Sequence, residues 1–118
     1  MGVQIPSLAP AMPDIQVIAR ITLQNATREI PLIFKPGGKR LNVGRASDNE
    51  LTLNDGSVSK IHAALLMTAE GTLLVADTGS TNGTYINGRR IAYGESRLIE
   101  DGDVIGFGDV EVRLRKSE

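Results

Sequence analysis

The sequence predicts an all-β fold, a sandwich or barrel of short strands, and three observations support this prediction. Apolar and polar residues alternate with a period of two in several stretches of the 118 residues, as in strands with one buried face. Clusters of glycine, proline, asparagine and aspartate separate these stretches at short intervals. No stretch of ten or more residues has the apolar spacing of a helix, because the helix formers of residues 63–70 have apolar positions two apart.

The first two strands are predicted to form a hairpin. Apolar residues alternate over residues 15–23 and again over 30–34, which predicts two half-buried strands. A polar segment at 25–27 is the predicted turn between them. The sequence Pro-Gly-Gly at 36–38 ends the second strand.

The middle of the chain predicts four more strands and one long irregular segment. Two short strands are expected at 41–43 and 51–53. A longer strand follows at 61–67, whose odd-numbered positions are apolar and are expected to share one face, and another lies at 73–75. Residues 77–83 are too polar and too rich in glycine for a regular element.

The last part of the chain again predicts short strands between tight turns. Strands at 84–86 and 89–91 flank Asn87-Gly88, a pair favoured in two-residue hairpin turns. The remaining predicted strands are separated by Asp-Gly and Gly-Asp turns and lie at 98–99, 104–105 and 110–114.

Length and composition are those of one folded domain. The chain has 41% apolar and 23% charged residues, as in an ordinary globular protein. Residues 1–14 carry three prolines among small residues and are predicted to be a flexible linker or tail. The folded domain is predicted to occupy residues 15–118.

Composition also argues against several classes of function. A net charge of −1 and an aromatic content of 3% argue against a nucleic-acid partner. No apolar run approaches the length of about 18 residues that crosses a membrane, so no membrane partner is expected. The absence of cysteine excludes thiolate metal sites and favours a reducing, cytoplasmic location. The aspartates lack calcium-loop spacing and 79–83 lacks the features of a nucleotide-binding loop, so neither metal nor cofactor is expected.

Three polar clusters, each at the end of a predicted strand, are the candidate functional residues. They are Gly44-Arg45, the segment Ser-Lys-Ile-His at 59–62, and the segment Ser-Thr-Asn-Gly-Thr at 80–84. Together they provide a guanidinium group, an ammonium group, several hydroxyls and glycine-rich backbone. These are the groups that bind a phosphate without reacting with it.

One alternative is a hydrolase, with Ser59 and His62 completed by Asp77 or Asp101. In a strand that begins near Ser59, positions 59 and 62 point to opposite faces. Ser59 also lacks the Gly-x-Ser-x-Gly surroundings of a nucleophile elbow. We therefore expect no catalytic residues, and we expect His62 to be a buried structural residue that ties loops together.

The order and spacing of these clusters resemble a known family. Gly44-Arg45, the segment 59–62, the segment Asp-Thr-Gly-Ser-Thr-Asn-Gly-Thr-Tyr-Ile-Asn-Gly at 77–88 and the closing segment 98–108 together resemble the forkhead-associated (FHA) domain. The resemblance covers about residues 16–115. It implies a sandwich of two twisted, mainly antiparallel sheets with about eleven short strands, and ligand loops at one end that read phosphothreonine peptides.

The resemblance also implies a role for each motif residue. The residues expected to hold the phosphate are Arg45, Ser59, Lys60 and Thr81. Asn82 is expected to bind the backbone of the ligand beside the phosphothreonine. The residues expected to shape the loops without touching the phosphate are Gly44, His62, Gly83 and Asn87.

The function that follows is that of a binding module and not of an enzyme. The domain is expected to bind a phosphothreonine-containing segment of another protein, as an adaptor in Ser/Thr kinase signalling. It is expected to be monomeric and to belong to a larger multidomain protein. The alternative is an interaction module of the same fold that binds its protein partner without phosphate.

Overall fold

The computed structural model describes residues 12–117, which form eleven β-strands and no helix. None of this part of the chain could therefore cross a membrane as an apolar helix. In chain order the strands are β1 (Ile15–Leu23), β2 (Ala26–Phe34), β3 (Leu41–Gly44), β4 (Leu51–Thr52), β5 (Ala63–Met67), β6 (Leu73–Asp77), β7 (Thr84–Ile86), β8 (Arg89–Arg90), β9 (Ser96–Leu98), β10 (Ile105–Phe107) and β11 (Val110–Lys116). Residues 1–11 of the predicted linker lie outside the described residues.

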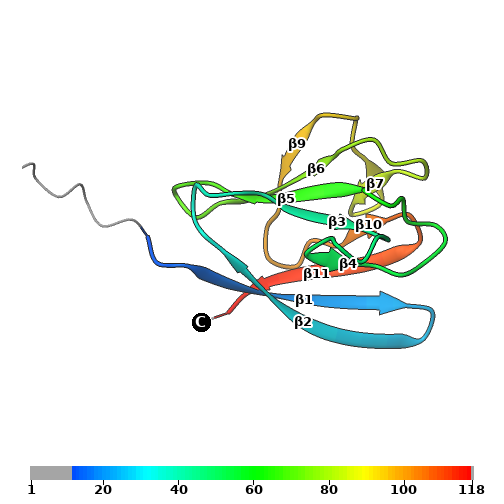
Figure 1. Ribbon diagram of the computed structural model, residues 1–118, viewed down its shortest axis with the longest axis horizontal. Coiled ribbons are helices and arrows are strands. Elements are labelled where there is room, and N and C mark those ends of the chain that lie inside the picture. Colours follow the sequence, from blue (N-terminus) through cyan, green and yellow to red (C-terminus); the bar gives the residue numbers. More distant parts are fainter. Residues whose placement is uncertain (1–11, 118) are drawn as a thin grey trace, which may run out of the picture.

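The strands form two stacked sheets, which confirms the predicted fold class. One sheet has six strands in the order β2-β1-β11-β10-β7-β8, and the other has five in the order β4-β3-β5-β6-β9. In Figure 1, β1, β2 and β11 lie below β3, β5 and β6. Adjacent strands pair antiparallel throughout, except that β4 runs parallel to β3, with Val43 beside Leu51.

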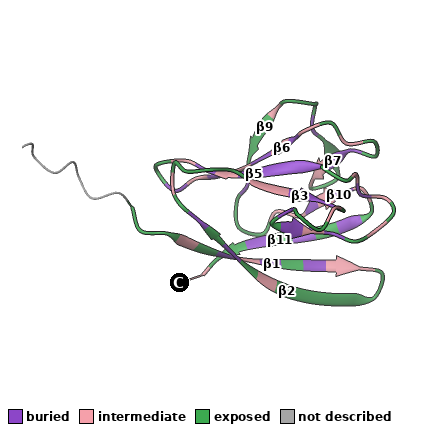
Figure 2. Cartoon of the chain, viewed as in Figure 1, coloured by how far each residue is buried: buried purple, intermediate pink, exposed green. Residues whose placement is uncertain are grey.

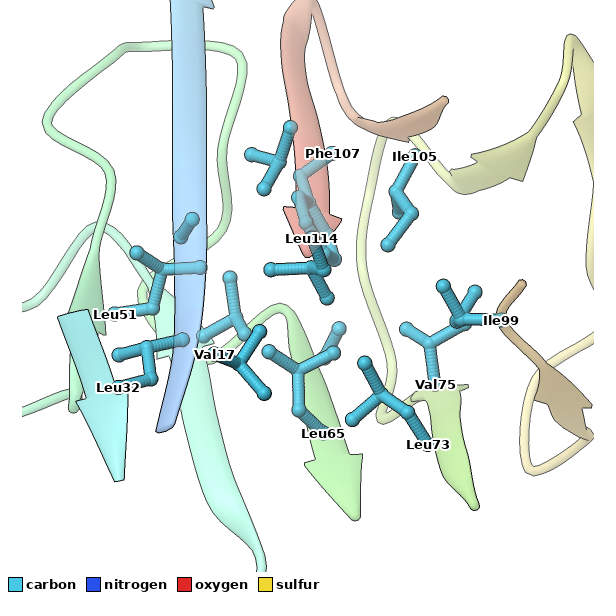
Figure 3. Close-up of a cluster of buried hydrophobic side chains, with 14 of the residues drawn as sticks. Val17, Leu32, Leu51, Leu65, Leu73, Val75, Ile99, Ile105, Phe107 and Leu114 are labelled. Carbon is cyan, nitrogen blue, oxygen red and sulfur yellow. The ribbon is translucent and has the colours of Figure 1, made fainter. Parts of the chain in front are cut away.

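The core fills the space between the two sheets. Alternate residues of β1 and β11 point inward and are fully or almost fully buried, whereas their neighbours in sequence are more exposed (Figure 2). Figure 3 shows Val17 of β1 and Leu114 of β11 in one cluster with side chains of the opposite sheet, among them Leu65 of β5 and Val75 of β6. Burial of apolar area is the main force that holds the sheets together. The period-two pattern of the sequence therefore determines which face of each sheet packs against the other.

The β1–β2 hairpin differs from the prediction in its turn. Leu23 pairs with Ala26, so the turn is Gln24-Asn25, and Ala26 and Thr27 belong to β2. Gln24 accommodates the turn in the left-handed region, with φ of 55°. Along β2, Pro31 has no N–H to donate, and an edge strand tolerates such a residue.

The main correction concerns the predicted strand 61–67. β5 begins only at Ala63, and the side chain of Ile61 is 60% exposed instead of sharing the buried face. The cause lies in the preceding residues, because the backbone N–H of Ser59 donates to Nδ1 of His62 at 3.0 Å. This bond closes a turn over 59–62, so the argument that Ser59 and His62 lie on opposite faces of one strand was wrong.

Candidate functional site

Three loops meet at one end of the sandwich, on the right in Figure 1: residues 45–50 after β3, 53–62 after β4 and 78–83 after β6. Backbone and side-chain hydrogen bonds join them. The N–H of Arg45 donates to the Ser59 carbonyl at 2.9 Å, and the N–H of Thr81 donates to the Ser59 hydroxyl at 3.0 Å. The loops are therefore positioned by one another as well as by their strands.

The structure brings together all five residues that the sequence predicted to contact a ligand. They line one open pocket of about 530 Å³, called here the loop pocket. These five residues are Arg45, Ser59, Lys60, Thr81 and Asn82.

Arg45 is held by its inner side and free at its outer end. Its Nε donates to the Val58 carbonyl at 3.1 Å, and within residues 12–117 its two terminal nitrogens have no hydrogen-bond partner. Gly44 makes this position possible, since a Cβ there would overlap the Lys60 carbonyl oxygen. The planar end of the guanidinium is thus available for two parallel bonds to an anion.

The hydroxyl and amide groups of the loop pocket also keep unused hydrogen-bonding capacity. The Ser59 oxygen accepts from Thr81, which leaves its own proton free to be donated outward. The Nδ2 of Asn82 donates one proton to the Ser57 carbonyl at 2.8 Å. Its second proton and its side-chain carbonyl remain available to a bound chain.

His62 lies beneath the loop pocket and connects two of its loops. Its side chain is 0% exposed. Nδ1 accepts from the Ser59 N–H, so the ring proton lies on Nε2, which donates to the Gly83 carbonyl at 2.9 Å. Burial is the main cause of the lowered pKa of His62, opposed by the bond to Gly83 and the charge of Asp77. The histidine is therefore a buried, neutral link between two of the loops.

Asp77 organises the loop 78–83, and the sequence analysis did not identify this role. One carboxylate oxygen accepts from the backbone N–H groups of Gly79 and Ser80, and the other accepts from the hydroxyls of Ser80 and Thr84. Burial alone would raise the pKa of Asp77, but these hydrogen bonds, led by those from Ser80, lower it. The sequence Asp-Thr-Gly-Ser at 77–80 could have indicated this role, since an aspartate carboxylate in a turn often accepts hydrogen bonds from backbone N–H groups shortly after it in the chain.

Asn49 is a second supporting residue that sequence reasoning missed. Its side chain is 8% exposed, and its Nδ2 donates to the carbonyls of Ala46 and Lys60 at 2.8 Å each. It thereby joins the first loop to the second directly below Lys60. No local pattern indicated this residue, because one of its partners is eleven positions away in the chain.

The remaining predicted loop-shaping residues occupy two different places. Gly83 adopts a φ of 92°, and its carbonyl accepts from both His62 and Gly108. Asn87 lies at the β7–β8 turn and not at the loop pocket. Its side chain bonds the N–H of Val104 at 2.9 Å and the carboxylate of Asp103 at 3.0 Å, so it links that turn to the β9–β10 connection.

The arrangement suits binding better than catalysis. The Ser59 hydroxyl bonds Thr81, and His62 bonds the backbone N–H of Ser59, so the two side chains do not form a nucleophile–base pair. In the described part of the chain, no three acidic or histidine side chains are grouped to hold a metal ion. What the loop pocket offers is a cationic fork beside free hydrogen-bond donors.

Comparison with known families and proteins gives a consistent result. The family model of the FHA domain matches residues 41–108. The ABC transporter ATP-binding/permease protein Rv1747 of Mycobacterium tuberculosis is 34% identical over 111 residues, which are 94% of this chain and 11% of that protein. Nibrin of Danio rerio is 34% identical over 60% of this chain and 8% of that protein. The chain thus spans only about a tenth of the length of these curated relatives.

A solved structure agrees with the sequence comparison. A domain from a structural and functional study of phosphothreonine-dependent FHA domain interactions superposes with a TM-score of 0.72 and 27% identity, covering 87% of this chain and 98% of that one. The fold thus follows that of an FHA domain from a study of phosphothreonine-dependent interactions.

Proposed function

The chain belongs to the FHA domain family, and from this membership and the groups in the loop pocket we propose that it binds phosphothreonine-containing segments of other proteins. The observation that supports this proposal most strongly is the position of the Arg45 side chain. Its Nε is bonded to the Val58 carbonyl, its two terminal nitrogens have no partner among the described residues, and the side chain lines the loop pocket. A phosphothreonine carries close to two negative charges at neutral pH and three acceptor oxygens, which this fork matches.

The other residues of the loop pocket have complementary roles in this proposal. Ser59 donates its free hydroxyl proton to a phosphate oxygen, and Thr81 adds a further hydroxyl bond. Lys60, which is exposed at the rim, contributes a second positive charge. Asn82 uses its free amide groups to hold the peptide backbone next to the phosphothreonine.

We also propose the broader setting of this binding. The domain acts as an adaptor in Ser/Thr kinase signalling, in a reducing compartment, as a monomeric unit of a larger protein. FHA domains are binding modules, so the domain binds and releases its partner without altering it. A catalytic activity elsewhere in a longer protein is compatible with this role.

Titration with one peptide in three forms tests the proposal. The peptide carries phosphothreonine, phosphoserine or unmodified threonine at one position, and calorimetry measures the dissociation constant of each. We expect binding only of phosphorylated forms. The threonine methyl group adds at most about 1–3 kcal/mol of preference over phosphoserine if it is well packed. Equal affinity for the unmodified peptide would favour the phosphate-independent module instead.

A phosphothreonine peptide library would identify the sequence context of the ligand. Randomised flanking positions show which residues beside the phosphothreonine the domain selects. If no member of the library binds while the domain is folded, phosphothreonine recognition by this domain is refuted.

A further inference from the structure

A second open pocket also borders the loop 78–83. It has a volume of about 460 Å³ and is bounded by this loop and by residues 90–93, which follow the β7–β8 turn. Gly79 lines both this pocket and the loop pocket. The two pockets are therefore neighbours, and a peptide bound in the loop pocket can reach the second pocket by crossing Gly79.

Two side chains of the second pocket rest against the two glycines of the loop. The ring of Tyr93 lies 3.6 Å from the place where a Cβ of Gly79 would stand. The Nε of Arg90 lies 2.7 Å from the corresponding place at Gly83, and its Cζ lies 3.0 Å away. Both glycines have positive φ, a conformation that favours glycine. Because neither has a Cβ, each leaves room for a neighbouring side chain. Arg90 and Tyr93 are thereby kept beside the ligand loop.

The charge of Arg90 is not neutralised by the protein. Among the described residues it makes no ion pair and no side-chain hydrogen bond. The other charged side chain lining this pocket is Asp77, whose oxygens already accept four hydrogen bonds from the loop and from Thr84. Nearby, Glu95 pairs with Arg97. Of the two charged side chains that line the second pocket, Arg90 is therefore the one with no hydrogen-bond or ion-pair partner among the described residues.

Tyr93 is the apolar wall of the same pocket. Tyr93 is 77% exposed, so the face of its ring is open to a bound chain. The ring lies against Gly79, at the boundary between the two pockets. An extended peptide that crosses this boundary can pack on the ring while an acidic side chain reaches Arg90.

Building on the proposed function, we infer that the second pocket is a subsite for the same phosphopeptide, in which Arg90 pairs with an anionic side chain near the phosphothreonine. The anion is an aspartate, a glutamate or a second phosphorylated residue, which share the chemistry that a guanidinium recognises. In this arrangement Arg45 supplies the dependence on phosphate. Arg90 then selects among phosphopeptides.

A scan of aspartate positions tests the inference. In a phosphothreonine peptide, one residue at a time is made Asp or Asn within about four residues on either side, a reach of about 13 Å along an extended chain. For each position, calorimetry compares the dissociation constants of the Asp and Asn peptides for the unmodified domain, for Arg90→Gln and for Arg89→Gln. Arg89 is the matched control, because it is the adjacent exposed arginine of β8 and does not line the second pocket.

At one or two positions we expect the Asp peptide to bind the unmodified domain about two- to fivefold more tightly than the Asn peptide, as for an exposed ion pair. This preference should vanish in Arg90→Gln, persist in Arg89→Gln and weaken as salt is added. Replacing Asp by phosphoserine at the same position should enlarge the Arg90-dependent preference, since the charge is larger.

Other outcomes would contradict the subsite, the proposed function or both. A preference for Asp that is the same in Arg90→Gln as in the unmodified domain, or no preference at any position, would overturn the subsite while leaving phosphothreonine binding intact. If the unmodified domain binds none of the phosphopeptides, the proposed function fails and the subsite fails with it. Thermal unfolding of both arginine variants, expected to be unchanged, establishes that the comparison is between folded proteins.

Discussion

At the scale of single residues, the loop pocket is built from side chains that bond to backbone on one side and face the pocket on the other. Arg45 is tied to Val58 and Ser59 to Thr81. These bonds fix the direction of the free groups before a ligand arrives, so less conformational freedom is lost on binding. His62 has both ring nitrogens bonded to backbone and has none left for a ligand.

The first prediction concerns His62→Ala. The substitution removes two hydrogen bonds, which leaves the Ser59 N–H without its partner and leaves the Gly83 carbonyl with only the bond from the Gly108 N–H. We expect the free energy of unfolding to fall by about 1–3 kcal/mol, measured by urea denaturation. Phosphopeptide affinity of the folded fraction should fall far less than in variants of Arg45. Unchanged unfolding together with complete loss of binding would show that His62 contacts the ligand directly.

At the scale of elements, the site consists of three loops whose shape depends on close backbone packing. The strands set where each loop begins, but Gly44, Asn49 and Asp77 set its path. Sequence reasoning found Gly44 through its motif and recognised 77–83 as irregular. It missed the roles of Asn49 and Asp77 because a side chain's hydrogen-bond partners depend on which distant segments fold beside it. It misplaced Ile61 because the period-two pattern continued into a turn closed by His62.

The second prediction concerns Asp77→Asn. An asparagine replaces one acceptor oxygen by an NH₂ group, which would face the N–H groups or hydroxyls that now donate to Asp77. Hydrogen bonds to a charged group contribute about 1.5–3 kcal/mol, and we expect a loss of stability of this order. Urea denaturation measures it.

Phosphopeptide affinity of Asp77→Asn should also fall, because Thr81 and Asn82 are carried by the same loop. Asp101→Asn is the control, since Asp101 is exposed in a turn between β9 and β10. Equal stability of the two variants would contradict the central role of Asp77 in the loop.

The third prediction concerns Gly44→Ala. A Cβ at Gly44 would overlap the Lys60 carbonyl oxygen and press on the Asn49 amide. Because the closest contact is with backbone of the neighbouring loop 53–62, that loop must move away from Gly44. We expect a loss of about 1–3 kcal/mol of stability and weaker phosphopeptide binding. Gly56→Ala is the matched control in the same region, since nothing lies within 4 Å of a Cβ there. A Gly44→Ala variant that matches Gly56→Ala in both measurements would contradict the packing argument.

At the scale of the whole molecule, the period-two pattern was sufficient to predict a sandwich, because the buried positions of β1 and β11 alternate strictly in the sequence. The pairing of the strands could not be derived in this way. The parallel pairing of β3 with β4, for example, depends on the loop 45–50 folding back, with the Leu53 N–H donating to the Gly44 carbonyl at 2.8 Å. Local patterns carry no information about such contacts between segments.

The fourth prediction is the dependence of stability on pH. His62 has a folded pKa below its ordinary value of 6.5, so an unfolded chain binds a proton more readily than the folded one. The contribution of His62 to the free energy of unfolding is therefore complete above about pH 6.5 and is lost as the pH falls through the lower folded pKa. Asp77 also has a lowered pKa, so its contribution is complete above its ordinary value of 3.8 and is lost only at more acidic pH.

We expect the unfolding free energy of the unmodified domain to decline as the pH drops below about 6.5, well before the aspartates titrate. In His62→Ala this early decline should be absent, while the later acid loss remains. Urea denaturation at a series of pH values measures both profiles. Parallel profiles for the two proteins down to pH 4 would contradict the assignment of a neutral, buried histidine.

The fifth prediction, on Arg45, tests the central claim most directly. Calorimetry measures one phosphothreonine peptide against the unmodified domain, Arg45→Ala and Arg45→Lys, with circular dichroism to establish that all three are folded. We expect no detectable binding to Arg45→Ala and weak binding to Arg45→Lys, because a point charge cannot replace the planar fork held by Val58. Unchanged affinity in a folded Arg45→Ala variant would show that the loop pocket is not where phosphothreonine binds.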